Sequence, residues 1–139
     1  MKYDISALGN ALVDTQYMVD HDFLHEIGLE ADSMTLASAE EHSPIIDKLE
    51  SMGVESVSDC GGSATNSLVA ASYYGSKCHH VCRVANDEDG KKYLESLQKA
   101  GVQHIGYSKE DSEMPTGKCL IFVTPDAKRT MSSMLGISA

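Results

Sequence analysis

The segment DCGGSATNSLVAASYYG, residues 59–75, places two adjacent glycines directly before a run that is typical of a helix. Glycine lets a backbone approach a ligand closely, because it carries no side chain. The start of a helix adds unpaired N–H groups and a dipole that favours electron-rich groups. We therefore predict a helix after this diglycine turn, with a site for a polyhydroxylated or anionic molecule at its start.

Asn66 lies in the first turn of the predicted helix. Its side-chain amide offers both a donor and an acceptor, the combination that a vicinal diol requires. Gly61 and Gly62 would bring main-chain N–H groups to the same molecule. The segment also fits a second interpretation, a tight strand-to-helix turn in which Asn66 is only solvated.

The earlier segment GNALVDTQYMVD, residues 9–20, supplies a carboxylate, Asp14, just after the predicted first strand. Open α/β sheets bind their ligands where strands end, and a carboxylate accepts hydrogen bonds from two hydroxyls at once. Asn10 precedes Asp14 by four residues and would share the site. Taken alone, Asp14 also fits an ordinary loop carboxylate.

The charge balance excludes some classes of partner. The chain has 139 residues, with 11 basic and 21 acidic side chains and a formal net charge of −10. Nucleic acids and anionic membrane surfaces both attract cationic proteins, so we expect neither as a partner. The sequence contains neither a signal peptide nor an apolar run long enough to span a membrane, and we expect a cytoplasmic protein.

Four cysteines occur, at positions 60, 78, 82 and 119, and none forms a CxxC pair. The run CHHVCRV, residues 78–84, resembles a metal clip at first sight. It fits a buried strand better, because free cysteine behaves as a small apolar residue and structural zinc sites need four well-spaced ligands. We expect reduced thiols and no metal site, and we interpret all six histidines as structural or surface residues.

Strand and helix patterns alternate along the chain, which indicates α/β layers with extra strands projecting from them. Residues 3–9 predict a short buried first strand. Ser38 and Glu41 fit a capping box for a helix that ends near Gly53, although Pro44 leaves open a start near Ser43. The other predicted elements are helices at 63–75 and 86–102, strands at 77–85 and 103–108, and a hairpin at 117–135 around the turn TPDAK.

Four separated motifs together resemble the PfkB (ribokinase-like) carbohydrate kinase family. They are LGNALVD, GGSATNS, RVANDEDG and TGKCLIFVTPDAKRTM, in this order along essentially the whole chain. The segment GNALVDTQYMVDHDFLHEIGLEADSMTLA is most similar to the adenosine kinase-like branch. The resemblance implies a ribokinase-like three-layer α/β/α sheet with a small β-strand lid, carried by strands near residues 15–19, 34–37 and 55–59.

The resemblance also implies a function, the ATP-dependent phosphorylation of a hydroxymethyl group on a nucleoside or sugar. Asp14 would hold ring hydroxyls, the diglycine would approach them through its backbone, and Asn66 would complete the clamp beside Asn10. Arg129, on the hairpin, would contact the substrate or the incoming phosphate. Many sugar kinases of the family carry an acidic residue where Lys128 stands, so its absence favours a nucleoside.

The family's catalytic base belongs to a glycine-rich GAGD-type motif, and this sequence contains no such motif. A phosphate loop of the GxxxxGK[ST] type is also missing. We expect residues 1–139 to be the N-terminal acceptor-binding and lid portion of a kinase that is truncated before its ATP-binding half. ATP and Mg²⁺ would bind mostly in that missing half, and this chain alone would be inactive.

Truncation of the sheet would leave strand edges that invite pairing with another chain. We therefore expect a homo-oligomer formed through the lid or through exposed edge strands, which gel filtration would detect. The sequence leaves a second function open, a non-catalytic module that binds a nucleoside or sugar, or another protein, without chemistry.

Overall fold

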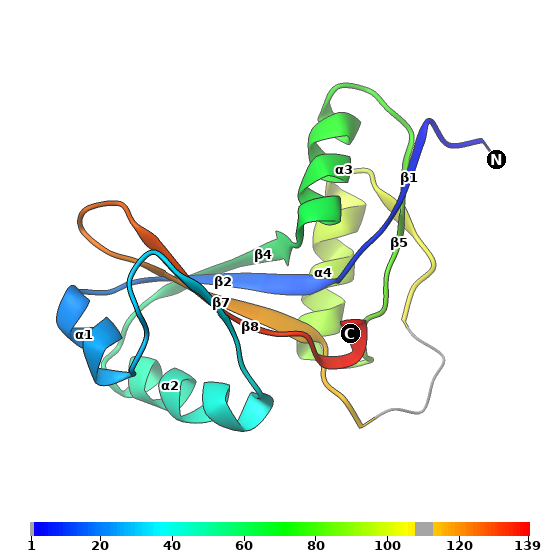
Figure 1. The fold of residues 1–139 in the computed structure, drawn as a ribbon. Helices are drawn as coiled ribbons and strands as arrows, with labels where there is room; N and C mark the ends of the chain where they lie inside the picture. The colour runs from blue at the N-terminus through cyan, green and yellow to red at the C-terminus, as the bar shows by residue number, and fades with distance from the viewer. Residues whose placement is uncertain (1, 108–112) are drawn as a thin grey trace. The chain divides into compact units, whose positions relative to one another are not determined.

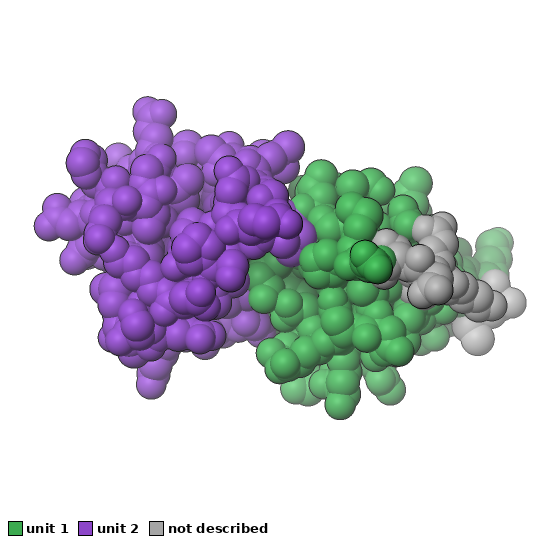
Figure 2. All heavy atoms as spheres, turned by 90° about the horizontal axis from the view of Figure 1, so that it is seen from below, with its two compact units in different colours: residues 1–13, 59–118, 135–139 green, residues 14–58, 119–134 purple. Residues whose placement is uncertain are grey.

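The computed structural model describes residues 2–107 and 113–139 of the chain (Figure 1). The chain divides into two compact units, which Figure 2 shows in separate colours. Unit 1 comprises residues 1–13, 59–118 and 135–139, and unit 2 comprises residues 14–58 and 119–134. No helix of the described part is long and apolar enough to cross a membrane.

Unit 1 is built on a three-stranded parallel sheet with two helices. Its strands lie in the order β1 (Ile5–Leu8), β5 (Cys78–Val81) and β6 (Gln103–His104). Parallel neighbours need a crossover, which α3 (Ser63–Tyr73) and α4 (Glu88–Lys99) provide. Their apolar faces form one buried core with the sheet: Ala11, Val13, Leu68, Cys78, Cys82, Val84, Tyr93, Leu94, Leu97, Ala100 and Val102.

The first strand is not buried as the sequence pattern suggested. Ala7 packs against the core of unit 1, but Leu8 is 80% exposed. Side chains alternate between the two faces of a strand, and only the face that carries Ala7 packs against this core. The apolar composition of β1 therefore predicted the strand correctly and its burial wrongly.

Unit 2 contains most of a five-stranded sheet in the order β3-β8-β7-β2-β4. β3 pairs in parallel with β8, with Met34 opposite Met131. The strand bounds are β2 (Leu12–Met18), β3 (Met34–Leu36), β4 (Ser56–Gly61), β7 (Gly117–Val123) and β8 (Arg129–Met134). Strands therefore form near all three segments that the sequence analysis assigned to the lid, and β2, β4 and β7 continue into unit 1.

Two helices, α1 (His21–Glu26) and α2 (Ala39–Ser51), pack on one face of this sheet. The residues buried between them and the sheet are Tyr17, Phe23, Leu24, Leu49, Leu120 and Phe122. Among these, Phe23 and Phe122 bring their ring centroids within 5.9 Å. Such aromatic pairs add stability beyond the apolar area that they bury.

The capping box predicted for α2 is present. The Ser38 hydroxyl accepts from the Glu41 backbone N–H, and the Glu41 carboxylate accepts from the Ser38 N–H at 2.7 Å. The helix begins at Ala39, so Pro44 lies inside it and does not mark its start. The cap satisfies two N–H groups that an α-helix leaves unpaired, which favours the earlier start.

The predicted hairpin is confirmed, with β7 and β8 joined at residues 124–128. The Ala127 N–H donates to the Thr124 carbonyl, and the Thr124 N–H donates to the Lys128 carbonyl. After β8, the chain re-enters unit 1 and ends in a short 3₁₀ helix, Gly136–Ser138.

Candidate functional site

The diglycine turn has a backbone shape that few residues other than glycine adopt. β4 ends at Gly61, and Gly62 is the residue before α3, with φ of 102°. A Cβ atom at Gly62 would lie 2.5 Å from the carbonyl oxygen of Asn10. Gly62 is therefore required twice, for its positive φ and for its close approach to the β1–β2 connection.

The same contact brings three of the predicted site residues together within unit 1. Asn10 and the two glycines meet at the turn, and Asn66 follows in the first turn of α3. The Asn66 N–H donates to the Gly62 carbonyl at 2.9 Å, which is the first bond of the helix. The side chains of Asn10 and Asn66 are both exposed, as a ligand contact requires.

The start of α3 keeps its N–H groups available. No side chain caps it, and its first turn contains no acidic residue. In contrast, Asp20 and Asp87 accept from backbone N–H groups at the starts of α1 and α4. An uncapped N-terminus of an 11-residue helix offers donors and a dipole to an electron-rich ligand.

Gly9, in the β1–β2 connection, also lies against the start of α3, although the sequence predicted it only as the end of a strand. A Cβ atom at Gly9 would lie 2.6 Å from the Cβ of Ala64 in α3. The absence of a side chain at Gly9 thus lets the β1–β2 connection pack directly on α3. The signal in the sequence was a glycine immediately before Asn10.

The other two predicted residues, Asp14 and Arg129, belong to unit 2, where both lie near one thiol. The pKa of the Cys119 thiol is raised, mainly by burial and further by the negative charge of Asp14. A hydrogen bond from the Ser133 hydroxyl and the positive charge of Arg129 act in the opposite direction. Ser133 Oγ lies 3.3 Å from Cys119 Sγ. The strands β2, β7 and β8 therefore gather a carboxylate, a guanidinium and two small polar groups.

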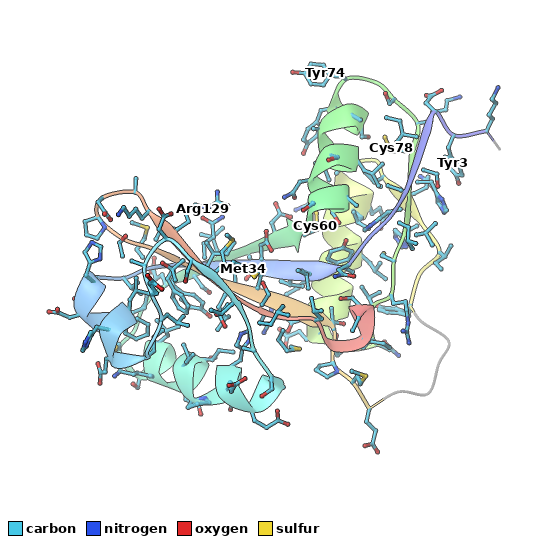
Figure 3. The ribbon with its side chains drawn as sticks, in the orientation of Figure 1. Tyr3, Met34, Cys60, Tyr74, Cys78 and Arg129 are labelled. Atoms are coloured by element: carbon cyan, nitrogen blue, oxygen red, sulfur yellow. The ribbon has the colours of Figure 1, made fainter. Side chains whose placement is uncertain are left out.

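This group lies on the face of the sheet away from α1 and α2. His42 of α2 contacts Ser132 at 3.0 Å, so Ser132 points toward the helices. Side chains alternate along a strand, so Arg129 and Ser133, at odd spacing from Ser132, point to the other face. Figure 3 shows Arg129 on the side of the sheet away from the helices. Asp14 is half-buried, and Arg129 is exposed.

A groove of about 710 Å³ lies elsewhere in unit 2, between the end of α1, β3 and α2. Its walls are mainly apolar and include Ile27, Leu29, Pro44 and Ile45. None of the predicted site residues lines this groove. It is therefore separate from the diglycine turn and from the group around Cys119.

Comparison with protein families gives a match over most of the chain. The profile described as pfkB family carbohydrate kinase matches residues 34–139. The chain belongs to this family. The pfkB match includes the diglycine turn, α3, α4 and the β7–β8 hairpin. It therefore covers three of the four motifs that carried the resemblance, and LGNALVD at residues 8–14 lies before the matched range.

Individual members of the family agree with this assignment. Adenosine kinase 2 of Arabidopsis thaliana is 28% identical over 131 residues, covering 91% of this chain and 36% of that protein. The crystal structure of adenosine kinase from Sinorhizobium meliloti matches with a TM-score of 0.84 and 29% identity, covering 99% of this chain and 41% of that one. A probable sugar kinase from Rhizobium etli CFN 42 matches with a TM-score of 0.85 and 27% identity, covering 98% and 40%.

These matches confirm the ribokinase-like α/β fold with its small β-strand portion. They also show that this chain spans about two fifths of the length of the pfkB kinases that it matches. The family and these relatives are kinases.

ATP and Mg²⁺ are the cofactors that the family implies, and two features of the chain bear on where they would bind. Residues 2–107 and 113–139 contain no group of three or more His, Cys, Asp or Glu side chains that could hold a metal ion. The sequence contains no glycine-rich phosphate loop. No residue of this chain is therefore assigned to Mg²⁺.

Proposed function

We propose that this chain is the acceptor-binding part of an ATP-dependent kinase that phosphorylates the hydroxymethyl group of an adenosine-like nucleoside or a sugar. The observation that supports it most is the turn where Gly62 approaches Asn10 at the uncapped start of α3, in a chain of the pfkB family. Polyhydroxylated acceptors need several donors and acceptors in one place, and this turn supplies both.

Each proposed residue has a distinct role toward the acceptor. The Asp14 carboxylate accepts hydrogen bonds from two ring hydroxyls. Gly61 and Gly62 donate backbone N–H groups, and Asn66 both donates and accepts. Arg129 contacts the substrate or the phosphate that is transferred to it. Asn10 contributes its side chain beside the turn, and the catalytic base is assigned to no residue of this chain.

The experiment that tests this function is isothermal titration calorimetry of the chain with adenosine, other nucleosides and ribose. We expect adenosine to bind about tenfold more tightly than ribose, because the base adds apolar surface to the contact. A coupled assay of ADP release should detect no phosphate transfer by this chain. Rapid transfer by the chain alone would contradict the assignment of acceptor binding only.

A second function, an interaction module without chemistry, has one observation in its favour. The edge strand β3 is exposed throughout, with Met34 58% and Leu36 68% accessible. Exposed edge strands pair readily with another chain, and pairing between two copies of this chain would give a homo-oligomer. Calorimetry without nucleoside or sugar binding, together with self-association in light scattering, would favour this function over acceptor binding.

A further inference from the structure

Three buried polar side chains form a hydrogen-bonded network inside unit 1. The hydroxyl of Tyr93, on α4, lies 2.7 Å from Oγ1 of Thr65 on α3 and 3.2 Å from Nδ1 of His80 on β5. All three side chains are 0% exposed. A buried polar group is costly unless it is paired, so Tyr93 is the link on which the other two depend.

The first end of this network lies under the diglycine turn. Thr65 is the third residue of α3. A Cβ atom at Gly62 would lie 3.4 Å from Thr65 Oγ1, on the same side as the contact with the Asn10 carbonyl. The hydroxyl that bonds Tyr93 therefore lies directly beside the turn whose N–H groups we assign to the acceptor.

The second end lies under the β1–β2 connection. His80 Nε2 is buried and has no hydrogen-bond partner among the described residues. A Cβ atom at Gly9 would lie 3.8 Å from this nitrogen. The His80 ring thus lies beside the residue directly before Asn10, and protonation would add a positive charge at this buried position, where Nε2 has no partner among the described residues.

We infer that Tyr93 is a positioning residue, which acts through Thr65 and His80 to hold the diglycine turn and Asn10 in the shape that binds the acceptor, and that protonation of His80 loosens this shape. The inference rests on the proposed function, because that function assigns the acceptor to this turn. It adds a pH-dependent control of the same site.

The groups around His80 favour its neutral form near neutral pH. Burial lowers the pKa of His80 below its usual value, and His79 on the same strand and His104 on β6 lower it further. From α4 the ring faces the neutral Tyr93 hydroxyl. Burial also raises the pKa of the nearby Cys82 thiol to about 11, partly offset by a hydrogen bond from Tyr93. No carboxylate is among the groups that shift the pKa of His80.

The sign of the pH effect follows from this lowered pKa. A histidine whose pKa is lowered in the folded state binds its proton more weakly than in an opened state, so acid favours opening. Acceptor affinity is therefore full at neutral pH and falls as the pH drops below the usual histidine range. His80→Asn places an amide near the position of Nδ1 and does not titrate, so this variant retains the bond to Tyr93 without the loss in acid.

The test is calorimetry with adenosine on the unaltered full chain and on two variants, Tyr93→Phe and Ser72→Ala. Tyr93→Phe keeps the ring and removes the linking hydroxyl, and we expect it to weaken adenosine binding about tenfold. Ser72→Ala is the matched control, since Ser72 donates another hydrogen bond from α3 to the Ala100 carbonyl at 2.7 Å, at the far end of the helix. It should lower stability and leave the affinity unchanged.

Two results would overturn the inference: an unchanged affinity in Tyr93→Phe, or equal losses in Tyr93→Phe and Ser72→Ala. If the His80→Asn variant still loses adenosine affinity in acid, protonation of His80 is not the cause of the pH effect. If the unaltered chain binds no adenosine, the proposed function fails, and NMR of the Gly62 and Asn66 amides then decides the inference. The inference is supported if the chemical shifts of these amides change with pH in the unaltered chain but not in His80→Asn. It is refuted if the shifts change neither with pH nor with this substitution.

Discussion

Replacement of Asp87 by alanine should destabilise the chain by about 3 kcal/mol, because one carboxylate accepts three hydrogen bonds from separate parts of unit 1. Its donors are the Gly90 N–H at 2.7 Å, the Thr116 N–H at 2.8 Å and the Thr116 hydroxyl at 2.7 Å. The first caps α4, and the other two hold the segment before β7. Urea unfolding followed by circular dichroism measures this change in the free energy of unfolding.

The control for this variant is Asp20→Ala, which removes a cap with one such bond, from the Phe23 N–H at 2.8 Å. Loss of a single N-cap costs about 1 kcal/mol. Equal losses in the two variants would show that the bonds of Asp87 to Thr116 contribute little, contrary to this account.

The same carboxylate gives unit 1 a dependence on pH. Burial raises the pKa of Asp87, but hydrogen bonds from Thr116 and Gly90 outweigh it, and the net pKa lies below the usual value. A lowered pKa stabilises the folded chain above the unfolded pKa of the group, and this stabilisation is lost as the pH falls through the folded pKa. Asp87→Ala should therefore flatten the decline of stability in acid.

Gly62→Ala should abolish acceptor binding and lower stability by about 2–4 kcal/mol. The new methyl group would meet the Asn10 carbonyl oxygen at 2.5 Å, and the residue would have to keep φ at 102°. Because backbone atoms are involved, relief requires the β1–β2 connection or the turn to move. Adenosine titration and urea unfolding measure the two effects.

Gly75→Ala separates these two causes. Gly75 follows the same helix at its other end, with φ of 92° and no atom within 4 Å of an added Cβ. It should therefore cost about 1 kcal/mol from backbone strain alone and leave acceptor affinity unchanged. Similar affinity losses in both glycine variants would mean that the contact between Gly62 and Asn10 is not what shapes the site.

Elements defined by local sequence were predicted well. The capping box of Ser38 and Glu41, the helix after Gly62 and the hairpin around residues 124–128 each depend on residues a few positions apart. Hydrogen bonds of this range are encoded directly in the spacing of the side chains that make them.

Contacts between distant residues were not predictable in this way. Asp87 and Thr116 are 29 positions apart, and the sequence marked neither as a partner of the other. Tyr93 belongs to the helix predicted at residues 86–102, but the sequence does not indicate that its hydroxyl bonds Thr65 from 28 positions away. A pattern of apolar residues locates a buried face and does not identify which polar atoms meet inside it.

The resemblance to pfkB kinases also implied a single clamp formed by Asp14 and Asn66. The structure places Asn66 with Asn10 and the diglycine in unit 1, and it places Asp14 with Arg129 around Cys119 in unit 2. We propose that both groups contact one acceptor, and a measurement in solution tests this.

That measurement is a double-mutant cycle of adenosine affinity with Asp14→Ala, Asn66→Ala and the double variant. Asp47→Ala and Gln98→Ala serve as controls, since both side chains are exposed and neither residue is proposed to contact or to position the acceptor. If one acceptor is held by both groups, each single variant should lose at least tenfold in affinity. The affinity loss of the double variant should then be smaller than the product of the two single losses. The difference corresponds to a coupling energy of about 1 kcal/mol or more. Unchanged affinity in either single variant, or losses that multiply independently, would contradict a shared clamp.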